Sequence, residues 1–249
     1  MDIIKSCMDY YIYILNDEFM KIKEIIQRIQ SLYSKGVQSD DTRLSNRHIY
    51  NVLMSIRSTL ITQQIKKKQL ISAWNYQTLP CVELISVPSY ECPCIPPIGC
   101  EIVRSKYKLP APLNGLNGHI IHSVTSIDRR LKIDEIKLNA VNYQKGNRYT
   151  TSKINYFIHQ GYLYISTSTK MKVVTITALF EDPIKANQFR SMCDEQNNIC
   201  DYLEQEFPLD KDLETTAIQM ASEELINIFP QMIEDISNNT RDSHIQQSK

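Results

Sequence analysis

The chain has 249 residues, of which 42% are hydrophobic and 22% are charged, and its 28 basic and 28 acidic side chains cancel to a formal net charge of zero. A chain of this length can bury a core of its own, and it lacks the run of roughly 20 apolar residues that a membrane-spanning helix needs, so we expect no integral membrane protein. The zero net charge provides no overall field for nucleic acid, so DNA binding would need a local basic patch.

The first 76 residues are predicted to be helical. Apolar residues recur at helical spacing from residue 6 to about residue 33, and Gly36 follows as a stop signal. A second apolar stripe follows Ser45 and Asn46, either of which can cap a helix, and it continues to about Ile71. Two successive amphipathic helices with a short connection predict an antiparallel pair.

Residues 77–181 are predicted to form an antiparallel β domain, because β-branched and aromatic runs alternate here with Pro, Gly and Asn. The clearest hairpin joins Asn155–His159 to Tyr162–Ser166 through Gln160 and Gly161. The other expected strands are Leu79–Val87, Glu101–Lys106, His119–Ile127, Ile133–Tyr143 and Lys172–Phe180. Their natural packing is a meander or a small antiparallel barrel.

Residues 182–237 are predicted to be a C-terminal helical segment, with its strongest periodicity from Leu213 to Ile236. The polar residues 238–249 are expected to be a flexible tail or an arm that orders against a partner. The predicted fold class is therefore α+β. It consists of long amphipathic helices, an N-terminal pair and a C-terminal helix, with an inserted antiparallel β domain over 77–181.

Charge is segregated along the chain. Residues 43–72 contain six basic residues and no acid, whereas residues 181–235 contain fourteen acids against three bases. One interpretation is two solvated helix faces, and the other is mutual attraction within a subunit or between neighbours in an assembly. The predicted interface residues are Arg47, Arg57, Lys66, Lys67, Lys68, Glu214, Glu223 and Glu224.

No arrangement of residues indicates recognisable chemistry. The seven cysteines are an odd number, which favours reduced thiols over a disulfide framework. Cys81, Cys92, Cys94 and Cys100 are the best metal candidates, but the tight pair has a single residue between its members, so small buried side chains are the preferred interpretation. We predict no catalytic, cofactor-binding or metal-binding residues, and no enzyme.

Short motifs of the central segment form a set that points to a family. They are Cys81-Val-Glu-Leu84, Cys92-Pro-Cys94, Gly99-Cys100, Arg104-Ser105-Lys106 leading to Leu109-Pro110, Ser123-Val-Thr-Ser-Ile-Asp128, and Ala178-Leu-Phe-Glu-Asp-Pro183. The set resembles neck structural proteins of crAss-like bacteriophages, which are ring proteins that join portal to tail. The layout over about residues 50–224 is also similar to that of head-to-tail adaptors of short-tailed phages.

The resemblance implies a non-enzymatic component of the virion neck or tail, assembled in the cytoplasm of the bacterial host. The expected partners are the portal protein, other neck and tail proteins, and further copies of the chain in a ring. Such families are commonly twelve-fold, which a heterologous contact can generate. DNA would pass through the channel without sequence-specific binding, and no cofactor or membrane is expected.

Three alternatives remain open at this point. One is another virion assembly protein, such as a head completion factor or tail component. The others are a metal-dependent enzyme that uses the cysteine loop, and a nucleic-acid-binding module. A ring would favour the connector, bound zinc the enzyme, and strongly salt-dependent DNA binding the module.

Overall fold

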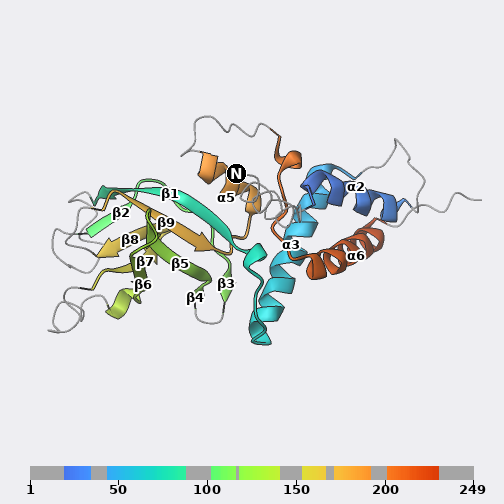
Figure 1. The fold of residues 1–249 in the computed structure, drawn as a ribbon. Helices are drawn as coiled ribbons and strands as arrows, with labels where there is room; N and C mark the ends of the chain where they lie inside the picture. The colour runs from blue at the N-terminus through green and yellow to red at the C-terminus, as the bar shows by residue number, and fades with distance from the viewer. Residues whose placement is uncertain are drawn as a thin grey trace, which may run out of the picture.

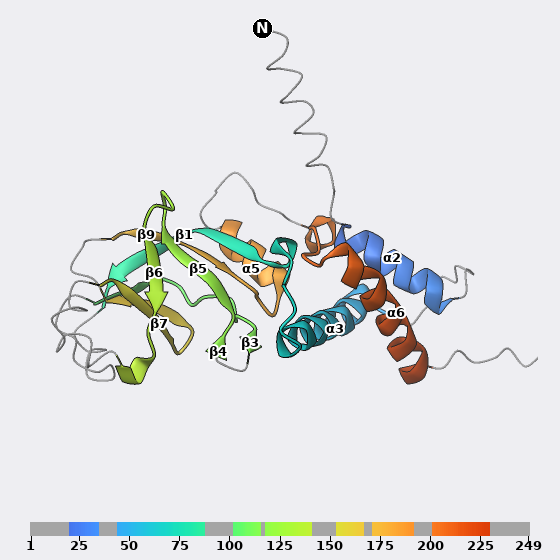
Figure 2. The ribbon, with the colours of Figure 1, turned by 60° about the horizontal axis from the view of Figure 1, so that its bottom comes forward.

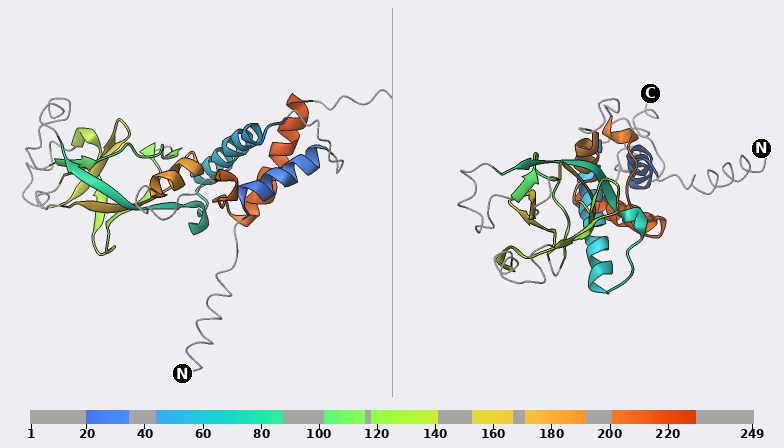
Figure 3. Two further views of the ribbon diagram at one scale, coloured as in Figure 1. Left: turned by 90° about the horizontal axis from the view of Figure 1, so that it is seen from above. Right: turned by 60° about the vertical axis from the view of Figure 1, so that its left-hand side comes forward.

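The computed structural model describes residues 20–34, 44–87, 102–115, 118–140, 153–166, 171–191 and 201–229. The α-helices there are α2 (Ile22–Tyr33), α3 (Asn46–Lys66), α5 (Pro183–Ser191) and α6 (Lys211–Ile228), with short 3₁₀ turns η1 (Ala73–Asn75), η3 (Leu138–Ala140) and η4 (Tyr202–Glu204). The strands are β1 (Gln77–Ser86), β2 (Ile102–Ser105), β3 (Asn114–Gly115), β4 (Gly118–His119), β5 (Ile121–Ser126), β6 (Lys132–Glu135), β7 (Asn155–His159), β8 (Tyr162–Ser166) and β9 (Val173–Ala178). Figures 1 and 3 show the strands at one end and α2, α3 and α6 at the other, with α5 over the junction.

The helical end is built by three amphipathic helices. In α2 the buried residues are all isoleucines at helical spacing, Ile22, Ile25, Ile26 and Ile29. Ser45 caps α3, since its hydroxyl accepts a hydrogen bond from the amide of His48 at 3.2 Å. The C-terminal helix α6 packs against both α2 and α3 (Figure 2), and it buries Ala217, Ile218, Ala221 and Leu225 against them.

Seven strands close into a barrel in the order β1-β2-β8-β7-β6-β5-β9, with β9 pairing back to β1. Among the described strands, all pairs are antiparallel except β6 with β7, which is parallel. Buried residues of these strands form an apolar cluster that includes Leu79, Val124, Leu163 and Ile176, and Ile102, Phe157 and Tyr164 form a second, smaller cluster. The barrel interior is therefore packed with side chains, as expected for a barrel of this size.

The predicted hairpin is confirmed. Strands β7 and β8 have the predicted bounds, and they pair from Asn155 opposite Ser166 to His159 opposite Tyr162. Both turn residues, Gln160 and Gly161, have positive φ, which is the backbone geometry of a tight two-residue hairpin.

The predicted fold class was wrong. Two of the four described helices are short, with 12 and 9 residues, and the other two have 21 and 18. The strands close into a seven-stranded barrel that contains a parallel pair, instead of forming a purely antiparallel domain inserted between long helices. The local sequence pattern identified strands but not which strands pair with each other. Closure comes from β1, which pairs with β2 through its last three residues and with β9 along most of its length.

The helical core and the barrel core meet at two consecutive residues. Leu179 belongs to the apolar cluster of the helices and Phe180 to that of the barrel, and both are buried. The backbone amide of Leu113 donates to the carbonyl of Leu179 at 2.7 Å, which ties the segment before β3 to the same place. The division into 1–76, 77–181, 182–237 and 238–249 stays a prediction, and its last segment lies outside the described residues.

The expectation of reduced thiols does not hold at Cys81, which is disulfide-bonded in the structure. The other six cysteines lie outside the described residues. A disulfide sulfur is not a thiolate, so Cys81 in this state cannot serve as the metal ligand that the cysteine group would need.

Candidate assembly interface

The structure separates the basic residues of α3 into three places. Arg47 lies exposed in the first turn of the helix, and Lys66 lies exposed in its last turn. Lys67 and Lys68 follow at once and are also exposed, with Lys68 in the left-handed region at φ 55°. Arg57, in the middle of the helix, is 0% exposed.

Arg57 holds the junction between helices and barrel. Its Nε donates to the carbonyl oxygen of Pro208 at 2.9 Å, one terminal nitrogen donates to that of Phe180 at 2.9 Å, and the other to that of Asn75 at 3.3 Å. The guanidinium carbon also lies 6.0 Å from the centre of the Phe207 ring. Burial lowers the pKa of Arg57 to about 10, while the electrostatic influence of Tyr50 and Asp182 opposes the shift, so the side chain stays charged at neutral pH.

Arg57 is thereby removed from the predicted interface, because a fully buried guanidinium cannot contact a neighbouring subunit. The spacing of Arg57 in the sequence already indicates that it is buried. Arg57 stands four residues from both Leu53 and Ile61, on the stripe that α3 buries. A planar group with several donors suits three converging carbonyl groups better than an ammonium would.

The predicted acidic interface residues of α6 also differ in their exposure. Glu214 is half-buried, and its pKa is raised by desolvation while Arg28 of α2 and Lys211 oppose the shift. It therefore interacts with α2 of its own chain. Glu223 and Glu224 are exposed, further along the same helix.

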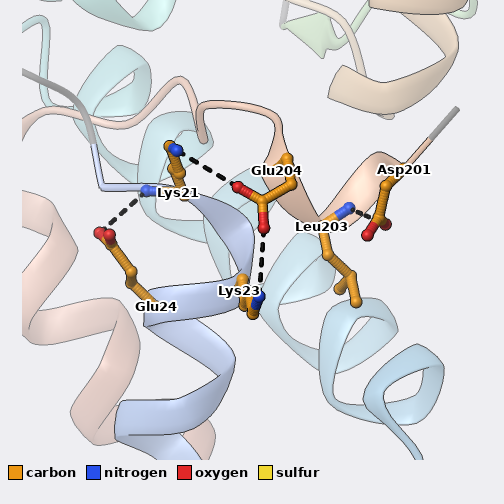
Figure 4. Close-up of polar contacts among 6 residues, drawn as sticks. All are labelled: Lys21, Lys23, Glu24, Asp201, Leu203 and Glu204. Atoms are coloured by element: carbon orange, nitrogen blue, oxygen red, sulfur yellow. Dashed lines mark hydrogen bonds and ion pairs between the residues drawn. The ribbon is translucent and has the colours of Figure 1, made fainter. Parts of the chain in front are cut away.

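A cluster of opposite charges joins α2 to η4 within the chain (Figure 4). Glu204 accepts from Lys21 and from Lys23, each at 3.2 Å. The hydrogen bonds from Lys23 and Lys21 lower the pKa of Glu204 below its ordinary value. One acid of the acidic stretch 181–235 is thus paired inside the subunit. Its partners are lysines that lie outside the basic stretch 43–72.

The polar outer face of α3 borders an open groove of about 450 Å³ against the segments that flank the barrel. The groove is lined by Ser55, Ser58, Thr62, Asn114 and Lys185 among others. Among the described residues, no group of three or more His, Cys, Asp or Glu side chains is placed to hold a metal ion. No described helix is long and apolar enough to cross a membrane.

Comparison with known proteins assigns the chain to a family. Residues 24–245 match the family model described as phage tail ring protein 2. The chain belongs to this family of crAss-like phage ring proteins. It is 29% identical over 199 residues to ring protein 2 of Bacteroides phage crAss001, an alignment that covers 76% of this chain and 84% of the relative. The predicted resemblance to crAss-like phage ring proteins is confirmed, and the chain is a structural component of a virion.

Two features of this phage ring protein were missed at the level of sequence, and both are exposed apolar side chains. Leu70 and Trp74, in the turn after α3, are 97% and 49% exposed. At the far end of α6, Ile226, Ile228 and Phe229 are exposed as well. Helical periodicity alone could not identify them, because their exposure depends on where the neighbouring elements end.

Proposed function

We propose that the chain is a non-catalytic ring subunit of the virion neck that joins the capsid portal to the tail and surrounds the DNA channel. The observation that carries this proposal is the match to phage tail ring protein 2 over residues 24–245. The ring is a homo-oligomer, and twelve copies would match the symmetry common to connectors of this kind. DNA passes through it without sequence-specific contacts.

The contacts between the helical core and the barrel core support a structural role. Three carbonyl groups from separate segments converge on Arg57, and Tyr50 of α3 donates to Asp182 at the start of α5 at 3.1 Å. Buried charged hydrogen bonds of this kind hold two cores in a fixed relation. A subunit whose two ends keep a fixed relation can transmit a defined geometry from one neighbour to the next.

The exposed members of the predicted charged set remain the proposed interface. They are Arg47, Lys66, Lys67, Lys68, Glu223 and Glu224, since Arg57 is buried and Glu214 faces α2. Exposed charges of opposite sign mainly set orientation and the rate of encounter between subunits, and they add little affinity individually.

The location can be tested by labelling intact phage particles with an antibody fragment raised against the purified protein. The proposal predicts label at the junction between capsid and tail. Label further along the tail would favour a tail ring away from the portal, as the family description also permits. An absence of label on particles opened at the neck would contradict a neck component.

A further inference from the structure

Two surfaces at the helical end of the subunit combine exposed apolar side chains with charges of opposite sign. We call the first the basic turn, and it consists of Lys66, Lys67, Lys68, Leu70 and Trp74. We call the second the acidic end, and it consists of Glu223, Glu224, Ile226, Ile228 and Phe229.

We propose that the basic turn of one copy docks onto the acidic end of the next, so that the ring is closed by a head-to-tail contact between these two surfaces. This inference rests on the proposed homo-oligomeric ring and assigns the surfaces that build it. The occupant of each surface is a second copy of this chain.

The basic turn exposes two large apolar side chains. Leu70 is 97% exposed and Trp74 is 49% exposed, and both follow shortly after three consecutive lysines. Lysines near a helix C-terminus are favoured by the helix dipole, which accounts for Lys66 and Lys67 but not for the apolar pair. Lys68 also occupies a left-handed position, φ 55°, that glycine would fill with less strain.

The acidic end offers the complementary chemistry. Ile226 is 40% exposed, Ile228 51% and Phe229 39%, shortly after the adjacent acids Glu223 and Glu224. Apolar contact supplies affinity, and the pairing of three lysines with two glutamates selects the orientation. Exposed apolar groups rimmed by charge are typical of protein interaction sites.

The positions of the two surfaces determine the kind of contact. The ring of Phe229 lies 5.5 Å from that of His48, so the acidic end is beside the beginning of α3. The basic turn follows the other end of α3, and the 21 residues of that helix separate the two surfaces by about 30 Å. Figures 1 and 2 both show these helix ends apart. Two different, distant and complementary surfaces make a heterologous contact, which closes into a ring when the rotation permits.

The most direct test uses mixed cysteine variants. Leu70→Cys protein is mixed with Ile228→Cys protein, assembled alone or on the portal of the same phage, and treated with a short bifunctional maleimide. The proposal predicts crosslinked dimers that contain one chain of each variant. Mixing Leu70→Ser with Ile228→Cys controls for the native cysteines. Crosslinks confined to like variants would indicate a symmetric contact and overturn the proposal.

A charge swap provides the second test. Reversing the basic turn (Lys66→Glu, Lys67→Glu and Lys68→Glu) or the acidic end (Glu223→Lys and Glu224→Lys) should raise the concentration for half-assembly roughly tenfold. Both sets in one chain should restore assembly. The matched control reverses Lys132 and Lys137, which are exposed on the barrel side. Circular dichroism checks that each variant is folded.

The outcomes separate this inference from the proposed function. A wild-type ring that tolerates both reversals, with no crosslink between unlike variants, would overturn the docking surfaces and leave the ring proposal standing. A wild-type protein that forms no ring alone or with portal would overturn both.

Discussion

Charge alone suggests that Arg57 lies on the surface, whereas its spacing along α3 correctly indicates that it is buried. Its membership of the six basic residues in 43–72 suggests a charged surface, although its spacing from Leu53 and Ile61 puts it on the buried stripe of α3. What no local pattern could provide is its partners. The carbonyl groups of Asn75, Phe180 and Pro208 come together only once the chain has folded.

Replacing Arg57 with alanine should lower the free energy of unfolding by about 3–5 kcal/mol, because it leaves buried carbonyl groups unpaired and opens a cavity at the junction. Arg57→Lys should be destabilised less than Arg57→Ala, because lysine keeps the charge. Some loss should remain, because an ammonium group cannot reach three carbonyl groups as the planar guanidinium does. Urea denaturation measures both. Arg47→Ala, an exposed change in the same helix, is the control and should stay within about 0.5 kcal/mol of wild type. A loss at Arg57→Ala no larger than at Arg47→Ala would contradict the structural role.

Glu204 gives a prediction for pH. Its pKa is lowered in the folded state by Lys23 and Lys21, so its stabilising contribution is present above the ordinary glutamate pKa and is lost as the pH falls through the lowered value. Glu204→Gln should therefore melt at a slightly lower temperature than wild type at neutral pH. The difference should vanish in acid. A difference that is constant from neutral to acidic pH would show that the ion pairs in Figure 4 do not contribute.

Among the helices and strands, prediction from sequence succeeded where a pattern is local. The β7 and β8 hairpin was predicted to the residue because its turn needs two positive φ values, which Gln160 and Gly161 supply. The α3 cap at Ser45 was one of two predicted alternatives. A small antiparallel barrel was one of two predicted packings, but its strand order and the parallel pair β6 with β7 were not predicted. Pairing such as β2 with β8 joins residues about 60 positions apart, and period-two alternation does not specify a distant partner.

The predicted arm at residues 238–249, which lies outside the described residues, can be tested by truncation. Ending the chain at Ser237 should leave the thermal unfolding transition unchanged, because the buried clusters of the described residues end by Leu225. Contact with a partner ring should weaken. Differential scanning calorimetry and a portal pull-down measure the two effects. A truncated protein that no longer unfolds cooperatively would refute the interpretation as an arm.

In the molecule as a whole, a packed barrel and a three-helix end are joined at Leu179, Phe180 and Arg57. The family match makes the chain a phage ring protein, and the short motifs of the central segment indicate the same family. The candidate interface was predicted only partly. Exposed charge follows from the sequence pattern along α3 and α6, but the exposure of the apolar residues that accompany it, such as Leu70 and Ile228, depends on the tertiary fold.

The role as a ring subunit of the neck is tested most directly by measuring the mass of the purified protein alone and after mixing with the portal protein of the same phage. We predict a complex with several copies of the chain in a fixed ratio to the portal subunits. Two separate components at every concentration and salt tested, with no ring of the protein by itself, would contradict this role.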